Sequence, residues 1–135
     1  ISESTGRKYS EFLTSRSAER DFRIIMTGLA RDRKELYDRI NSRVDRMIEK
    51  GLEKEARGLL GLRGLNPLKS VGYTELFDFF EGRISRETAI ELIKRNSRRY
   101  AKRQMTWWNR DPGIAWFHPG NFREIISHIE SEIGK

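Results

Sequence analysis

The sequence predicts an α/β fold that is predominantly helical and has two short strands. Runs rich in β-branched and aromatic residues, at about 22–28 and 114–117, end at glycine or proline and are typical of buried strands. Amphipathic helical patterns fill the sequence between them, and a helical crossover makes two strands of one sheet parallel. Two short strands do not form a stable sheet alone. The chain is therefore either mostly helical or part of a larger α/β protein.

The N-terminal residues 1–20 are polar and contain Thr5-Gly6 as a breaker. We expect a short helix near 8–13, a loose segment, and then the strand at 22–28, whose nearly continuous apolar run predicts burial on both faces. The chain begins at Ile1 rather than methionine, which suggests a processed or excised piece of a longer protein.

The first long helix is predicted at about 33–50. Asp32 and Glu35 have the spacing of a capping box, and Gly51 ends the pattern. Its core stripe consists of Leu36, Ile40, Val44, Met47 and Ile48.

Three arginines, Arg39, Arg43 and Arg46, line one edge of that stripe. Their guanidinium groups could hold a phosphate chain in bidentate fashion. They could equally pair with Asp38, Glu49 and neighbouring acids. Spacing alone leaves both interpretations open.

A second helix is predicted at about 52–60, followed by an irregular connection that is rich in glycine and contains Asn66-Pro67. A third helix begins after Gly72 and ends at Gly82. Its apolar content is more typical of core than of a binding surface: Leu76, Phe77, Phe79 and Phe80.

One stretch, residues 94–110, accounts for the net charge of the chain. It holds seven Lys and Arg, no acid occurs between Glu91 and Asp111, and the formal net charge of the whole chain is +7. A neutral protein with one concentrated cationic segment indicates a polyanionic partner. A solvated basic face is the simpler interpretation, but no acid alternates with these bases to neutralise them.

The cationic stretch lies on a predicted helix from Glu87 to Asn109, capped by Ser85. When its residues are placed at 100° intervals around the helix axis, one side is mainly apolar and the other is cationic. The expected core side holds Ile90, Ile93, Ala101, Met105 and Trp108, with Ser97 and Tyr100 among them. The opposite arc holds Lys94, Arg95, Arg98, Arg99, Lys102 and Arg103. After the second strand, a last amphipathic helix at about 121–132 is expected to bury Phe122, Ile125, Ile126 and Ile129.

The sequence lacks the residues and motifs that several kinds of catalytic, metal-binding and membrane-spanning sites require. There are no cysteines, only two histidines, no apolar run of the ~20 residues that span a bilayer, and no signal peptide. We therefore expect no membrane partner and a cytoplasmic location. Phosphate-loop, zinc-protease and dinucleotide motifs are missing, as is a Ser-His-Asp set. The sequence offers binding residues without a convincing general base or nucleophile.

Four blocks of the sequence resemble the C-terminal half of tRNA dimethylallyltransferases, also called tRNA isopentenyltransferases. The first is Asp32-Arg33-x-x-Leu36-Tyr37-x-Arg39-Ile40-x-x-Arg43-Val44-x-x-Met47, followed by Gly51-Leu52-x-x-Glu55. The others are Val71-Gly72-Tyr73-x-Glu75-Leu76, Glu81-Gly82-x-Ile84-Ser85 and Arg98-x-Tyr100-Ala101-Lys102-Arg103-Gln104-x-Thr106-Trp107. They occur in the family's order and spacing, and cover roughly residues 1–118. Thr5-Gly6-Arg7 also resembles a family T-G-K segment.

The resemblance implies a fold and an activity. The fold would be a P-loop-kinase-like parallel sheet protein, of which residues 1–135 form a single C-terminal fragment of the catalytic domain, with 1–20 as the tail of the preceding segment. The family moves a dimethylallyl group from its diphosphate to N6 of the adenosine 3′ of the anticodon. It is also nucleotide-binding and uses magnesium. The phosphate loop and the general base would lie upstream, and the magnesium ligands would lie outside this chain, so we expect this chain alone to be inactive.

The resemblance also assigns roles to residues. Arg43 matches the arginine that the family places on the prenyl diphosphate, with Arg39 as a supporting candidate. The tRNA anticodon arm would contact Lys94, Arg95, Arg98, Arg99, Lys102, Arg103, Gln104 and Trp107. We expect a monomer in the intact protein and self-association of the fragment through exposed strand edges. The alternatives are a stand-alone helical RNA-binding module without catalysis and, less well supported, a helix lying on anionic lipid.

Overall fold

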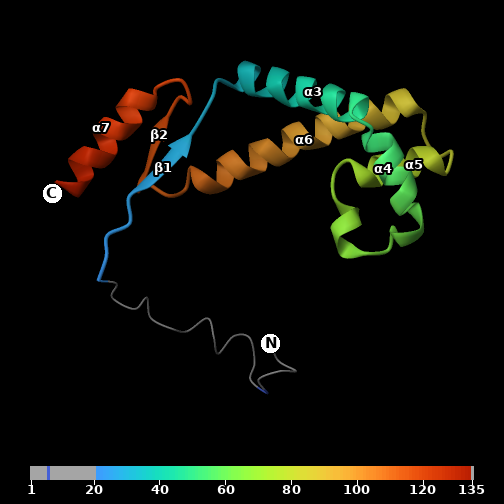
Figure 1. Cartoon of the computed structure of the whole chain (residues 1–135), viewed down its shortest axis with the longest axis horizontal. Helices are drawn as coiled ribbons and strands as arrows, with labels where there is room; N and C mark the ends of the chain where they lie inside the picture. Colours follow the sequence, from blue (N-terminus) through green and yellow to red (C-terminus); the bar gives the residue numbers. More distant parts are fainter. Residues whose placement is uncertain (1–5, 7–20, 135) are drawn as a thin grey trace.

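A computed structural model describes Gly6 and residues 21–134 of the chain (Figure 1). The elements, in chain order, are β1 (Met26–Leu29), α3 (Arg33–Glu49), α4 (Leu52–Leu59), the 3₁₀ turns η1 (Leu60–Leu62) and η2 (Asn66–Lys69), α5 (Tyr73–Phe80), α6 (Arg86–Trp108), β2 (Ile114–Phe117) and α7 (Phe122–Ile133). The prediction of a mostly helical chain with two strands is confirmed. The helix predicted near 8–13 lies outside the described residues.

The two strands pair in parallel, as predicted from the helical crossover between them. Met26 lies opposite Ile114 and Leu29 opposite Phe117, and the Ala30 N–H donates to the Phe117 carbonyl at 2.9 Å. Gly28 lies opposite Trp116, where a Cβ would come within 2.5 Å of the Trp116 ring. The strand pair therefore requires glycine at position 28.

The first strand is shorter and more exposed than predicted. It begins at Met26, because β2 begins opposite that residue and offers nothing for residues 22–25 to pair with. Phe22 and Ile24 are 65% and 53% exposed. The predicted burial on both faces is also wrong, since Leu29 is 59% exposed. In the described part of the chain the sheet has two strands, and β1 has a single neighbour.

The core lies among α3, α4, α5 and α6. Its buried apolar residues are Val44, Ala56, Leu68, Leu76, Phe77, Ala89 and Ile93. The long helices α3 and α6 run side by side in opposite directions (Figure 1), while α4 and α5 cover only the N-terminal half of α6. The interpretation of the helix at 73–80 as core is confirmed.

Side-chain hydrogen bonds cap α3 and α6 at the N-terminal residues that the sequence predicts. The Asp32 carboxylate accepts from the N–H of Lys34 at 2.8 Å and of Glu35 at 3.4 Å, and the Ser85 hydroxyl accepts from Thr88 N–H at 3.1 Å. These acceptors satisfy N–H groups that have no partner inside the helix.

A buried carboxylate fixes the start of α5 and joins it to α6. Glu75 is 5% exposed and accepts from Gly72 N–H at 2.8 Å and from the Asn96 side-chain amide at 2.7 Å. Gly72 has a φ of 108°, a conformation that side chains other than glycine rarely adopt. The glycine and glutamate of the Gly72-Tyr73-x-Glu75 block thus serve the turn into α5.

Tyr100 and Trp108, predicted on the core side of α6, are 54% and 50% exposed. Tyr100 lies two turns beyond Ile93 on the same side of the helix, but α4 and α5 do not extend that far. The helical period was therefore read correctly, but the described residues do not cover this side of the C-terminal half of α6.

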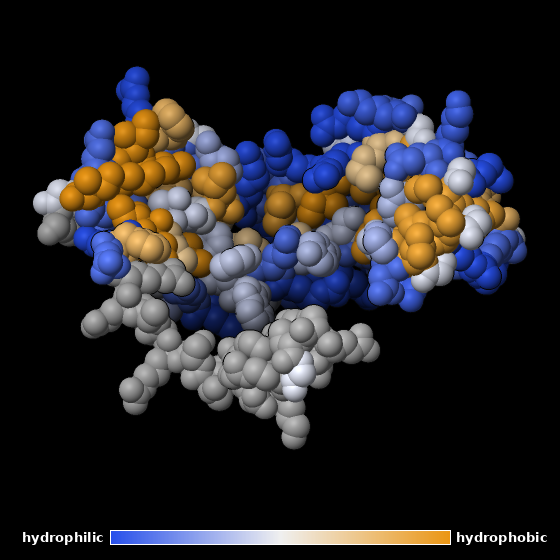
Figure 2. All heavy atoms as spheres, turned by 60° about the horizontal axis from the view of Figure 1, so that its bottom comes forward, coloured by the Kyte–Doolittle hydropathy of each residue, from blue (hydrophilic) through white to orange (hydrophobic). Residues whose placement is uncertain are grey.

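The last helix buries less than predicted. Phe122 and Ile126 are 68% and 39% exposed, whereas Ile125 and Ile129 are half-buried. Figure 2 shows apolar atoms gathered on the surface at the end of the molecule that carries α7 and the strand pair. A sheet with two described strands covers only part of the apolar face of α7.

Candidate nucleic-acid interface

The C-terminal half of α6 carries an open hollow of about 510 Å³ with cationic walls. Its lining residues are Arg99, Lys102, Arg103, Thr106, Trp107 and Arg110. All but Arg110 belong to α6, on which positions three or four residues apart share a face, and Arg110 lies in the turn directly after the helix. Four of the eight residues predicted to contact tRNA are therefore together in one place: Arg99, Lys102, Arg103 and Trp107.

Aromatic rings alternate with arginines along this face. The Arg103 guanidinium lies 5.7 Å from the centroid of the Tyr100 ring, and the Arg110 guanidinium lies 5.9 Å from that of Trp107. Trp107 is 66% exposed. Guanidinium groups beside aromatic rings suit a ligand with negative charge and flat surfaces.

Two predicted tRNA contacts, Lys94 and Arg98, face α3 rather than the outer arc. The Lys94 ammonium lies 2.8 Å from the Asp45 carboxylate, and this hydrogen bond raises the pKa of Lys94. Arg98 donates to the Asn41 side chain at 2.6 Å and lies 6.0 Å from the Tyr37 ring centroid. The expectation that both point outward is wrong, because polar partners on α3 draw them into the contact between the helices.

The remaining predicted contacts, Arg95 and Gln104, lie apart from the hollow. Arg95 is exposed and donates weakly to the neighbouring Asn96 at 3.4 Å. Gln104 is exposed and lines a second hollow of about 390 Å³ between α6 and the strand pair, together with Trp108 and Trp116.

The arginines of α3 are exposed, but their surroundings differ. Arg39 and Arg46 line an acid-rich hollow of about 630 Å³, which also contains Glu35, Asp38, Ser42, Asp45 and Glu49. Arg43 lies outside that hollow. Over residues 21–134, none of these three arginines forms an ion pair with an acid. The alternative that they pair with Asp38 and Glu49 receives no support from these contacts.

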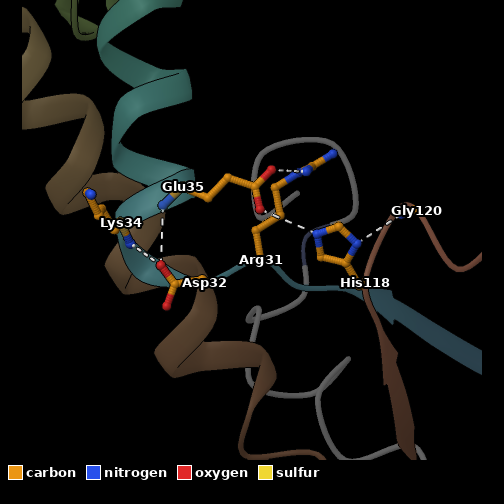
Figure 3. Close-up of polar contacts among 6 residues, drawn as sticks. All are labelled: Arg31, Asp32, Lys34, Glu35, His118 and Gly120. Atoms are coloured by element: carbon orange, nitrogen blue, oxygen red, sulfur yellow. Dashed lines mark hydrogen bonds and ion pairs between the residues drawn. The ribbon is translucent and has the colours of Figure 1, made fainter.

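A polar cluster fastens the end of β2 to the start of α3 (Figure 3). His118 Nδ1 accepts from Gly120 N–H at 3.1 Å, and its Nε2 lies 3.3 Å from the Glu35 carboxylate, which also pairs with Arg31. Since Nδ1 accepts, the proton of the neutral ring is on Nε2 and is donated to Glu35. This hydrogen bond lowers the pKa of Glu35, with a further contribution from Arg31.

The described residues contain no cluster of acids and histidines that could hold a metal ion. Magnesium, which the family resemblance implies, therefore finds no fitting set of ligands there. Nor does any helix in the described ranges combine the length and apolar content needed to cross a membrane.

Three features of the site escaped the sequence-based choice of residues. Thr106 and Arg110 line the main hollow, and Tyr100 stands beside Arg103. The spacing of Tyr100, Arg103, Trp107 and Arg110 at three- and four-residue intervals could have indicated them. Tyr100 was instead assigned to the core because it falls on the apolar side of the wheel.

The chain matches the model of a known protein family. The family model described as IPP transferase matches residues 1–111. The chain belongs to this family. The resemblance to tRNA dimethylallyltransferases is thereby confirmed.

Curated relatives of this member of the IPP transferase family are named tRNA dimethylallyltransferases. It is 54% identical over 129 residues to tRNA dimethylallyltransferase 2 of Parabacteroides distasonis, covering 96% of the chain and 43% of that protein. It is 51% identical over 129 residues to tRNA dimethylallyltransferase of Cytophaga hutchinsonii, covering 96% of the chain and 42% of the relative. The chain thus spans about two fifths of the length of these relatives.

Solved structures in the same family share the fold. The tRNA isopentenylpyrophosphate transferase of Bacillus halodurans matches 87% of the chain and 40% of its own, with a TM-score of 0.75 and 40% identity. The tRNA delta(2)-isopentenylpyrophosphate transferase of Staphylococcus epidermidis matches 98% of the chain and 45% of its own, with a TM-score of 0.76 and 30% identity.

Proposed function

We propose that the chain is the C-terminal portion of a tRNA dimethylallyltransferase, which moves a dimethylallyl group from its diphosphate to N6 of the adenosine 3′ of the anticodon. Family membership supports the reaction class. The observation that carries the role of this portion is the cationic hollow at the C-terminal end of α6, lined by the exposed Arg99, Lys102 and Arg103 of the helix and by Arg110 of the turn that follows it.

In this proposal α6 holds the tRNA by its phosphates. Most affinity for a nucleic acid comes from such contacts, and a base that reacts must be turned out of its stack. Arg95, Arg99, Lys102 and Arg103 are exposed and available to phosphates. Trp107 lines the same hollow as the last three, and Gln104 lines the second hollow, between α6 and the strand pair. Lys94 and Arg98 contact tRNA only by giving up Asp45 and Asn41, so their main role is to set the position of α6 against α3.

The proposal assigns Arg43 to the prenyl diphosphate. As the C–O bond breaks, the leaving diphosphate gains negative charge, which a fixed guanidinium stabilises. Arg43 is exposed and lies outside the acid-rich hollow, so its charge is available to a ligand. Arg39 lines that hollow with Asp38 and Asp45, which suits a supporting role.

The remainder of the machinery is proposed to lie in the part of the enzyme that the relatives have beyond this match. That part would supply the phosphate loop, the general base and the magnesium ligands on a P-loop-kinase-like sheet. The 135-residue chain alone would then be inactive. We propose that the intact enzyme is a cytoplasmic monomer.

Salt dependence tests the tRNA contacts. The enzyme for this test is the Parabacteroides distasonis relative in which this chain replaces the matching residues. Arg99→Ala or Lys102→Ala should each reduce the slope of log K against log salt by about one unit, since each removes one phosphate contact. Arg123→Ala, an exposed arginine on α7, is the matched control and should leave the slope unchanged. An unchanged slope for both α6 variants refutes the assignment.

Prenyl transfer in the same enzyme tests the diphosphate role. Arg43→Ala should lower the transfer rate about 100-fold or more, the scale of losing one preorganised charge-stabilising group. Arg46→Ala, one turn further along α3, should stay near the unaltered rate. A normal rate for Arg43→Ala contradicts the proposal. Binding of tRNA without any transfer by the unaltered hybrid would instead favour an RNA-binding module.

A further inference from the structure

The polar cluster of Figure 3 joins the first turn of α3 to the ends of both strands. One oxygen of the Glu35 carboxylate pairs with Arg31, which follows β1, and the other lies 3.3 Å from Nε2 of His118, which follows β2. Because the strands are parallel, Arg31 and His118 both come from the carboxyl ends of neighbouring strands. Glu35 therefore ties the start of α3 to the edge of the sheet at which both strands end.

The N-terminal half of α3 depends on polar contacts for its position. Within the described residues, Val44 is the one side chain of α3 that is buried, and it lies in the second half of the helix. Figure 1 shows α3 and α6 diverging toward the strand pair. Glu35 and His118 are both partly exposed, and ionic contacts of this kind contribute little to the stability of a fold. The main effect of their contact is on where α3 begins.

We infer that His118 is a positioning residue for prenyl transfer, which holds the start of α3 and its arginines at the carboxyl ends of the strands through Glu35. The inference rests on the proposed function, because it takes Arg43 as the residue that meets the prenyl diphosphate. Arg39 lies one helical turn after Glu35 and lines the same hollow, and Arg43 follows one turn later. In parallel sheets, ligands bind beside the carboxyl ends of the strands. A shift of Glu35 away from His118 would move both arginines relative to that edge.

Both ring nitrogens of His118 are engaged, which favours a positioning role over proton transfer. Nδ1 accepts from Gly120 N–H at 3.1 Å, so the proton of the neutral ring is on Nε2 and is donated to Glu35. A general base needs a nitrogen that can take a proton from the substrate. In this arrangement the imidazole instead connects a backbone N–H of one segment to a carboxylate of another.

The two contacts of His118 can be removed separately. In His118→Asn the side-chain oxygen replaces Nδ1 as the acceptor for Gly120 N–H, but the side chain is too short to reach Glu35. In His118→Gln the amide N–H lies close to the position of Nε2 and can still donate to Glu35. The pair therefore separates the contact with Glu35 from the local turn, and neither variant carries a group that could act as a base.

Steady-state prenyl transfer by the hybrid enzyme tests the inference. His118→Asn should lower kcat about fivefold, the equivalent of the ~1 kcal/mol that one hydrogen bond typically contributes. His118→Gln should stay within about twofold of the unaltered rate, since it restores a donor to Glu35. KM for tRNA should be unchanged in both variants, because the proposed tRNA contacts lie on and directly after α6. In a Glu35→Ala background, His118→Asn should cause no further loss.

Two kinetic results would overturn the inference. An unaltered kcat in His118→Asn would show that the contact with Glu35 does not serve the reaction. An equal loss in His118→Asn and His118→Gln would show that the imidazole itself is required, as a general base would be.

The position of α3 can be measured on the 135-residue chain without any activity. The sequence contains no cysteine, so Lys34→Cys on α3 and Arg123→Cys on α7, both at exposed positions, take one spin label each. His118→Asn should shift or broaden the distribution of distances between the labels, and His118→Gln should restore it. An unchanged distribution in His118→Asn contradicts the inference. Absence of prenyl transfer by the unaltered hybrid would instead count against the proposed function, on which the label distances do not depend.

Discussion

Glu75→Ala is expected to destabilise the helical core by about 3 kcal/mol. Glu75 is 5% exposed and accepts two hydrogen bonds, from Gly72 N–H and from Asn96. A hydrogen bond to a charged group contributes about 1.5–3 kcal/mol, so two give an upper range of about 3–6 kcal/mol. The removal also relieves the cost of burying a carboxylate, which places the expected value near the lower end.

Urea denaturation of the protein with and without Glu75→Ala measures this change. The midpoint should fall while the dependence on urea stays constant, and the thermal midpoint should fall by about 10 °C. Glu75→Gln should lower the free energy of unfolding by about half as much, because the side-chain amide keeps an acceptor for one of the two donors. The exposed Glu91 provides the control, and Glu91→Ala should cost less than about 0.5 kcal/mol.

A double-mutant cycle with Asn96→Ala examines the same reasoning. If the two side chains stabilise the fold through their mutual bond, the combined loss should fall short of the sum of the single losses by about 1–2 kcal/mol. Strictly additive losses, or a Glu75→Ala cost below 1 kcal/mol, would show that this buried bond does not hold α5 to α6.

Two further predictions concern the contacts of α3. Lys94→Ala should leave the salt slope of tRNA binding unchanged and cost about 0.5–1 kcal/mol of stability, because Lys94 pairs with Asp45; a slope reduced by one unit would contradict this. The lowered pKa of Glu35 stabilises the fold above about pH 4.5 and loses that effect as pH falls through the folded-state pKa. Urea titrations between pH 6 and 3 measure this effect. As the pH falls, the free energy of unfolding should decrease less in His118→Ala than in the unaltered protein, and equal decreases would refute the role of His118.

Helix boundaries were predictable because the residues that set them act locally. Asp32 and Ser85 bond to N–H groups two or three residues away, so both partners of each hydrogen bond lie in one short segment and can be recognised from its sequence. The start of β1 was not predictable in this way, because it depends on where Ile114 begins the partner strand.

Burial and pairing in the site depended on distant partners. The period of α6 places Tyr100 correctly on the side of Ile93, but it carries no information about how far α5 extends. Arg98 looked like an outward cation because its partner Asn41 is 57 residues away. The sequence could predict the helix and the concentration of cations on it. Which cations are free of partners depended on the packing of α3 against α6.

The parallel register of the strands has a consequence for the order of folding. Met26 pairs with Ile114, 88 residues further along the chain. Closing a flexible loop of that length costs about 4 kcal/mol in chain entropy, more than a four-residue strand pair can recover. The helices between the strands must compact first, since α3 and α6 shorten the distance that the ends have to cross. Formation of the strand pair is thus a late step that reports whether the helical part has folded, and refolding kinetics should show it after the helical signal.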